Sequence, residues 1–290
     1  MARGSEGRSS LSRQLQLLDA FSVDHPYLTA SEVARRSGVP MSTTHALLAD
    51  LERNELVERL PDRTFRLGVR LWELASRTPG VLGLRELALP HLVDLHAEVG
   101  QHVQLGVLNG GDAVFLERLS SRDAVVNVTV VGGRLPAHAS AVGLVLVAFA
   151  DTAVQDAVLA GPLERFTDRT IVDPAALRRT LHEVRTTGFA LGNGYVHADA
   201  RGLAVPITGA AGEVVAALGV VVPNDDAPWE PLRERLRRTA DAIAVDLRRA
   251  SLPQSDPEAS PGGRYRALVH SSDESMAYLA KTRPTPRARG

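Results

Sequence analysis

Hydrophobic residues near the start of the chain recur with the period of an amphipathic helix. The first set shares one helical face and lies at Leu11, Leu15, Leu18 and Phe21. A Thr-x-x-Glu capping box at 29–32 predicts the start of a second helix, and Gly38 predicts its end. A third helix is predicted from 40 to 54, because its leucines again form a stripe, at Leu47, Leu48 and Leu51.

Two short extended runs follow this third helix, at 56–60 and 64–67, joined by the turn-forming cluster 61–63. Three short helices followed by a two-stranded ribbon are the layout of a winged helix-turn-helix. In that motif the third helix presents its first residues to base edges in the major groove. The pattern therefore predicts a DNA-binding domain at residues 10–72.

The start of the third helix carries small donors and acceptors suited to contacts with bases: Ser42, Thr43, Thr44 and His45. Arginines on the second helix and on the ribbon are suited to phosphate contacts: Arg35, Arg36, Arg63 and Arg66. The pattern leaves one alternative open. A small helical interaction module would use residues 42–44 only to cap a helix.

The rest of the chain changes its periodicity twice. Residues 73–98 are leucine-rich and predict linker helices, interrupted at 78–80. From 99 to 252 strand-like runs alternate with helical ones, which predicts a mixed α/β domain and an α+β chain overall. The predicted strands include 102–108, 113–119, 124–131 and 214–222, and the predicted helices include 139–149, 174–187 and 231–252. Residues 1–9 and 253–290 are polar and rich in Gly, Ser or Pro, which is typical of a disordered arm and tail.

Leucines at 71, 74, 84 and 87 form a stripe that two short isolated helices cannot bury. We therefore expect a homodimer through the linker helices, with tetramers formed through the C-terminal domains as a further arrangement. A two-fold axis would match a palindromic operator.

Composition narrows the function classes. The chain has 290 residues, a net charge of −1, no cysteine and a single lysine, Lys281. These counts exclude a P-loop, a cysteine nucleophile and a thiolate metal site, and we expect no metal and no cofactor. His138 beside Ser140 lacks an orienting carboxylate, so we expect no enzyme activity. Without an apolar run of spanning length, we expect a cytoplasmic protein with no membrane partner.

Long stretches of the chain resemble the IclR family of bacterial transcriptional regulators. The resemblance covers roughly residues 10–250 and includes LTASEVARRSGVPMSTTHALLADLERNELVERLPDRTFRLGVRLWELA, LPAHASAVGLVLVAF and GLAVPITGAAGEVVAALGVVVP. It implies a winged helix-turn-helix, a dimerising linker helix and a C-terminal effector-binding domain. It also implies a regulator, here expected to be a repressor, whose affinity for double-stranded operator DNA changes with a small ligand.

The recognition helix departs from the family pattern. Met41 and Ala46 lie where the family usually carries basic residues. Without these basic residues, two contacts with DNA would be missing. A second hypothesis therefore stays open, in which the winged helix no longer binds DNA and the chain is a ligand-binding or interaction protein.

The resemblance also implies an effector site. Backbone N–H groups after His138 and Ser140, at Ala141, Val142 and Gly143, would hold an anion at a helix start. The polar pocket side chains of acid-binding members are replaced here by Gly192, Gly202, Gly219 and Val221, with Asn193 and Tyr195 nearby. We therefore expect an effector more apolar than a short keto acid, such as an aromatic or aliphatic acid with its carboxylate at 141–142. A pocket that has lost ligand binding is the alternative.

Overall fold

The computed structural model describes residues 9–76, 79–252 and 256. The chain divides into two compact units after residue 78, and each unit is described by itself. Within the described ranges no helix is both long enough and apolar enough to cross a lipid bilayer.

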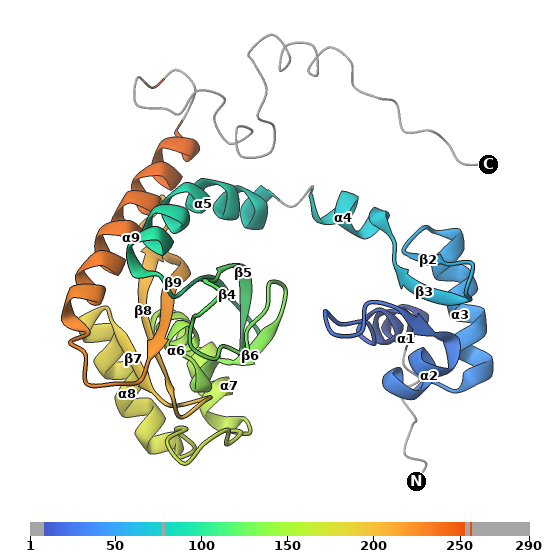
Figure 1. The fold of residues 1–290 in the computed structure, drawn as a ribbon, viewed down its shortest axis with the longest axis horizontal. Coiled ribbons are helices and arrows are strands. Elements are labelled where there is room, and N and C mark those ends of the chain that lie inside the picture. Colours follow the sequence, from blue (N-terminus) through green and yellow to red (C-terminus); the bar gives the residue numbers. More distant parts are fainter. Residues whose placement is uncertain (1–8, 77–78, 253–255, 257–290) are drawn as a thin grey trace. The chain divides into compact units, whose positions relative to one another are not determined.

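The first unit is a winged helix-turn-helix, as predicted (Figure 1). Its small sheet is antiparallel, with strand order β1-β3-β2. Its elements are α1 (Ser10–Leu18), β1 (Leu28–Thr29), α2 (Ala30–Ser37), α3 (Met41–Arg53), β2 (Val57–Arg59), β3 (Thr64–Leu67) and α4 (Val69–Ala75).

Local signals set the ends of these helices. The side chain of Thr29 accepts a hydrogen bond from the backbone of Glu32, whose carboxylate in turn accepts from the backbone N–H of Thr29, and this completes the predicted capping box. The carboxylate therefore has a pKa lowered mainly by its hydrogen bond to the Thr29 backbone. Gly38 ends α2 with φ of 69°, a left-handed conformation that glycine adopts without steric cost.

The predicted face of α1 is wrong for its first two residues. Leu11 and Leu15 are 63% and 50% exposed, whereas Leu17 is fully buried in the core of this unit. The core contains Leu17, Ala20 and the predicted Phe21, and the predicted Leu18 packs against it. A helix of nine residues has too few turns for its hydrophobic spacing to specify one face.

The second unit contains one six-stranded antiparallel sheet of order β6-β5-β4-β9-β8-β7. Helices α6 and α8 contribute to the core on one face, and α5 and α9 lie side by side over the other (Figure 1). The elements are α5 (Pro79–Val99), β4 (His102–Asn109), β5 (Asp112–Leu119), β6 (Arg134–Pro136), a 3-10 helix (Ala137–Ala139), α6 (Ala141–Phe149), α7 (Thr152–Ala160), α8 (Pro174–Thr187), β7 (Ala190–Asn193), β8 (Ala200–Thr208), β9 (Val214–Pro223) and α9 (Glu230–Ser251).

Strand β9 shows how the two faces differ. Leu218 and Val220 belong to the core beneath α5 and α9, whereas Ala217 belongs to the core beneath α6. A Cβ on Gly219 would lie 2.6 Å from a methyl of Val142, and one on Gly106 in the neighbouring strand would lie 2.6 Å from the other methyl. These two glycines therefore let the start of α6 approach the sheet closely.

The predicted strand at 124–131 is absent. We call residues 120–131 the strap; this segment turns at 122–123, forms no strand, and is held by hydrogen bonds to side chains. The backbone N–H of Val125 donates to Gln101 at 2.9 Å, and its carbonyl accepts from the ring of His102. The valine-rich pattern predicts extension, and only these tertiary contacts decide that no ladder forms.

The predicted leucine stripe of the linker is divided between the two units. Leu84 is 6% exposed and belongs to the core of the second unit, so it is not available for dimerisation. In the first unit α4 buries none of its residues and exposes Val69, Trp72 and Leu74.

Candidate DNA-binding surface and effector cavity

The side chains predicted to contact DNA bases lie at the start of α3. Ser42 and His45 are exposed and Thr43 is half-buried. Met41 and Ala46, the two positions that depart from the family pattern, are exposed on the same helix. The helix thus presents a small, largely uncharged surface rather than a basic one.

Thr44 is a correction to the predicted base-reading set. Its side chain is fully buried, and its hydroxyl donates to the carbonyl of Val39 at 3.2 Å. Thr44 shares the buried face of α3 with Leu47, Leu48 and Leu51. The helical spacing from 44 to 47, 48 and 51 is the sequence signal that identifies it as a core residue.

The predicted phosphate-binding arginines lie in different environments. The Arg36 Nε donates to the carbonyl of Ala20 at 2.8 Å, so this side chain braces α2 against the segment after α1. Arg66 forms an exposed pair with Glu58, at 2.7 Å, and this partner raises the pKa of the guanidinium. Arg35 and Arg63 are exposed on the surface.

The tip of the ribbon holds Arg63 in a defined turn. Arg63 has φ of 68°, and its backbone N–H donates to the carbonyl of Leu60 at 2.9 Å. The carboxylate of Asp62 accepts from both the backbone and the hydroxyl of Thr64. These hydrogen bonds lower the pKa of Asp62 and fix the turn that presents Arg63.

A cavity in the second unit contains most of the predicted effector site. Its empty volume, which includes solvent at its open mouth, is about 550 Å³. Its walls come from the sheet, the start of α6, the strap and the loop between β7 and β8. Of the predicted residues it is lined by Ser140, Ala141, Val142, Gly192, Tyr195, Gly202 and Val221.

Two predicted polar residues lie outside this cavity. The His138 ring is buried and bonds through Nε2 to the carbonyl of Glu164 at 2.9 Å, bordering a separate groove. Asn193 accepts from Arg201 Nε at 2.9 Å, and Arg201 also donates to the carbonyls of Asp225 and Ala227. His138 therefore joins the 3-10 helix to the segment before α8, and Asn193 bonds its partner across β7 and β8.

Two predicted glycines also lie outside the cavity lining. A Cβ on Gly143 would lie 2.3 Å from the carbonyl oxygen of Ala137, so this position packs against the 3-10 helix. Gly219 lies under Val142, as described above. The missing side chain at 219 is thus filled by Val142 and does not enlarge the cavity.

The start of α6 offers unused backbone donors. The Ser140 hydroxyl accepts from the N–H of Gly143 at 3.0 Å, and the Ser140 carbonyl accepts from Leu144 at 2.9 Å. The N–H groups of Ala141 and Val142 precede the first intrahelical hydrogen bond, and they form none with the described residues. Both residues line the cavity, so a carboxylate there would meet donors and the positive end of the helix.

The strap supplies cavity residues that the sequence interpretation missed. Within it Val126, Asn127, Val128 and Thr129 line the cavity, and Gln104 donates to the Thr129 hydroxyl at 2.6 Å. The alternation of valines and polar residues predicts a strand, and a strand prediction does not indicate that these residues line a binding site. The other missed lining residues are Phe115, Leu135, Ala139, Val196, His197, Ala200, Leu203 and Val220.

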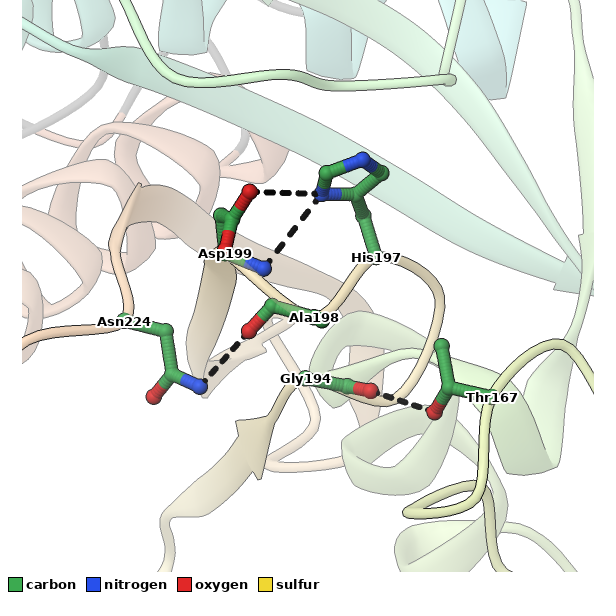
Figure 2. Close-up of polar contacts among 6 residues, drawn as sticks. All are labelled: Thr167, Gly194, His197, Ala198, Asp199 and Asn224. Atoms are coloured by element: carbon green, nitrogen blue, oxygen red, sulfur yellow. Dashed lines mark hydrogen bonds and ion pairs between the residues drawn. The ribbon is translucent and has the colours of Figure 1, made fainter.

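The loop between β7 and β8 is tied down from both sides (Figure 2). The Thr167 hydroxyl donates to the carbonyl of Gly194 at 2.6 Å, and Asn224 Nδ2 donates to the carbonyl of Ala198 at 2.8 Å. Within the loop, the N–H of Asp199 donates to His197 Nδ1 at 3.3 Å. These bonds position Tyr195 and His197 on the cavity wall. Burial raises the pKa of Tyr195, so its hydroxyl stays protonated near neutral pH.

Among the described residues, no group of three or more His, Cys, Asp or Glu side chains has the arrangement of a metal site. The donors at the cavity are backbone N–H groups, amides and hydroxyls. This set is suited to binding an organic ligand.

Comparisons with known proteins agree with this architecture. Residues 10–61 match the IclR helix-turn-helix domain, and residues 78–245 match the family described as bacterial transcriptional regulator IclR C-terminal. The chain is 31% identical over 243 residues to the HTH-type transcriptional regulator XynR of Escherichia coli, covering 82% of this chain and 96% of XynR. It is 32% identical over 255 residues to the HTH-type transcriptional regulator BhcR of Paracoccus denitrificans, covering 86% and 88% of the two chains.

Among solved structures, an IclR homolog from Microbacterium hydrocarbonoxydans, complexed with 4-hydroxybenzoate, is 44% identical. The match covers 83% of this chain and 99% of that chain, with a TM-score of 0.78. These relatives are transcriptional regulators and not enzymes, and they combine a DNA-binding domain with a ligand-binding one. The chain therefore belongs to the IclR family and is a ligand-responsive, DNA-binding transcriptional regulator.

Proposed function

We propose that this regulator is a repressor that responds to an aromatic carboxylic acid and binds a palindromic operator as a homodimer or tetramer. It acts in the cytoplasm, on operator DNA. The observation that carries the effector class is the cavity, which joins an apolar wall to the free N–H groups of Ala141 and Val142. A flat ring with one carboxylate satisfies both halves of this arrangement.

The structure of the 44% identical relative supports this ligand class, because that protein was crystallised with 4-hydroxybenzoate. A two- or three-carbon keto acid is disfavoured here, since Gly192, Gly202 and Val221 bring no polar side chain to the cavity. Each hydrogen bond to an anion that these three positions do not supply forgoes about 0.5–1.5 kcal/mol of binding free energy. The larger acid compensates by burying more apolar surface.

DNA binding is proposed to use Ser42, Thr43 and His45 for base contacts, with Arg35, Arg63 and Arg66 at phosphates. Arg66 exchanges Glu58 for a phosphate, because their pair is exposed and weakly held. Arg36 is a weaker candidate, since its Nε is already bonded to Ala20. Met41 and Ala46 are uncharged and cannot bind phosphates, so we expect a modest affinity for non-specific DNA.

The test is a salt-titrated binding assay on DNA from upstream of the protein's own gene, with and without 4-hydroxybenzoate. We expect specific binding that the acid alters by about fivefold or more, the usual scale of allosteric coupling. Arg63→Ala should reduce the salt slope by about 0.9, the value for one phosphate contact. Specific DNA binding that benzoates and keto acids leave unchanged would contradict the effector class, and absence of specific binding would favour the alternative of an interaction protein.

A further inference from the structure

Aromatic side chains are scarce in this chain, yet two of them meet in the effector cavity. Aromatic residues make up 4% of the sequence, and Phe115 and Tyr195 both line this one cavity. Phe115 comes from β5 and is 1% exposed, so it is a fixed part of the core. Tyr195 comes from the loop after β7 and is half-buried, which leaves part of its surface available to a ligand.

The ring of Tyr195 packs directly over Gly192. A Cβ built on Gly192 would lie 3.0 Å from Cδ2 of the Tyr195 ring, 3.4 Å from Cε2 and 3.5 Å from Cγ. A contact of 3.0 Å is tighter than most real Cβ contacts, so a side chain at 192 would require the ring to shift by a few tenths of an ångström. Gly192 lies on β7, where it pairs with Gly202 of β8, and both glycines border the cavity.

The loop that carries Tyr195 is held by hydrogen bonds on either side of the ring. The carbonyl of Tyr195 accepts from the Thr170 hydroxyl at 2.6 Å, and the carbonyl of Gly194 accepts from Thr167 at 2.6 Å. Further along the loop, Asn224 binds the carbonyl of Ala198 (Figure 2). The ring is therefore positioned before any ligand arrives, which lowers the entropic cost of binding against it.

We propose that Tyr195, resting on Gly192, makes the effector cavity selective for flat aromatic rings over saturated ones of similar size. The proposal rests on the effector role assigned to this cavity above. An aromatic ligand packs against the ring of Tyr195 in offset or edge-to-face geometry, whereas a puckered saturated ring fits the same space less closely. Aromatic pairs contribute about 0.5–1.5 kcal/mol beyond the area they bury, which corresponds to a preference of about two- to twelvefold.

The experiment compares benzoate with cyclohexanecarboxylate, which share the carboxylate and differ in the ring. Dissociation constants are measured by calorimetry on the full chain. Wild-type protein should bind benzoate about two- to twelvefold more tightly. Tyr195→Phe should keep this ratio because it keeps the ring, and Tyr195→Leu should reduce it to about one while retaining an apolar side chain.

Gly192→Ala tests the same contact without removing the ring. It should lower the benzoate preference in wild-type protein, and it should change nothing further in a Tyr195→Leu background, where no ring remains to be displaced. Gly111→Ala is the matched control. It adds a methyl group at a position that does not line this cavity, where its Cβ would lie 3.8 Å from the nearest atom, so the ratio should stay at the wild-type value.

A wild-type ratio near one, or a ratio that both Tyr195→Leu and Gly192→Ala leave intact, would overturn the role of Tyr195 while leaving the aromatic acid as effector. Wild-type protein that binds neither acid would overturn the effector class itself. Thermal unfolding of each variant without ligand identifies any that is misfolded. If Tyr195→Leu is misfolded, Gly192→Ala and Tyr195→Phe still decide the outcome.

Discussion

At the scale of single residues, burial separates side chains that the sequence groups together. Thr43, Thr44 and His45 are consecutive, yet Thr44 faces the core, Thr43 is half-buried and His45 is exposed. In the cavity, a glycine at 192 provides room for an aromatic ring, and a glycine at 219 provides room for a valine. The role of each residue is thus decided by what occupies the neighbouring space.

This separation predicts opposite effects for neighbouring residues of α3. Thr44→Val should lower stability by about 1 kcal/mol, since it removes the buried hydrogen bond to Val39, and should leave the DNA affinity of the folded protein unchanged. His45→Ala should keep stability and lose about 1–3 kcal/mol on the specific site, with little change on random DNA. Urea unfolding measures the stability of each variant, and fluorescence anisotropy measures its affinity for DNA. A selective loss of specific binding in Thr44→Val would mean that the helix reads DNA through another face.

The contact between Gly219 and Val142 predicts a stability effect that a second substitution relieves. Gly219→Ser would place its Cβ 2.6 Å from a Val142 methyl, and such overpacking costs about 1–3 kcal/mol. Val142→Ala added to this variant should recover part of that loss, because the collision disappears. Gly111→Ser is the control, since its Cβ would lie at 3.8 Å from the nearest atom. Additive effects of the two substitutions in urea unfolding would show that they do not share the space.

At the scale of elements, the strap is held by side chains of the sheet without forming a strand of it. His102 from β4 donates from Nε2 to the carbonyl of Val125, and its neutral ring accepts at Nδ1 from the Ser120 hydroxyl at 2.9 Å. Gln101 and Gln104 add bonds to Val125 and Thr129. One wall of the cavity is therefore held by side chains from β4 and from the residue before it, and His102 is the titratable group among them.

His102 predicts a dependence of stability on pH. Burial lowers the pKa of His102 from its ordinary value of 6.5. The hydrogen bond to Val125 raises this pKa, and the charges of Arg118 and His96 lower it further. The unfolded chain therefore binds a proton at a higher pH than the folded chain does. The stability that depends on neutral His102 is complete above 6.5 and decreases as pH falls through the lowered pKa.

Urea unfolding between about pH 8 and pH 5 measures this dependence. His102→Gln, which keeps one donor for Val125, should flatten the part of the curve that arises from His102. His182→Gln is the control, because His182 is exposed on α8 and its variant should keep the wild-type slope. A slope unchanged by His102→Gln would assign the pH dependence to other groups.

At the scale of the whole molecule, a net charge of −1 means that DNA attraction depends on where a few arginines lie and on the number of copies bound. A homodimer doubles those contacts and matches a palindromic operator. The exposed apolar surface of α4 is a candidate for this association. Val69 and Trp72 are each 70% exposed and Leu74 is 47% exposed.

This surface predicts the effect of two substitutions on assembly. Trp72→Ser combined with Leu74→Ser should weaken self-association, because solvent-exposed apolar area is the main driving force for burying this helix. Light scattering at micromolar concentration, without DNA, measures the mass. Val23→Ser, at a 65% exposed position outside α4 and α5, serves as the control and should leave the mass unchanged. A wild-type protein that is strictly monomeric would contradict the proposed assembly.

The sequence by itself determined the winged helix-turn-helix, most strands and helices of the second unit, and the family. Those features depend on local signals such as the capping box at Thr29 and the left-handed Gly38, and on long hydrophobic stripes such as that of α9. The sequence also identified seven residues of the cavity lining.

Only the tertiary structure decided which face of α1 is buried, that the strap forms no strand, and that Gly219 lies beneath Val142. It also removed Thr44 from the DNA surface and His138 from the cavity. The physical reason is the same in each case. Local spacing specifies a conformation, whereas burial and hydrogen-bond partners come from residues distant in the chain, and these contacts decide what each side chain can bind.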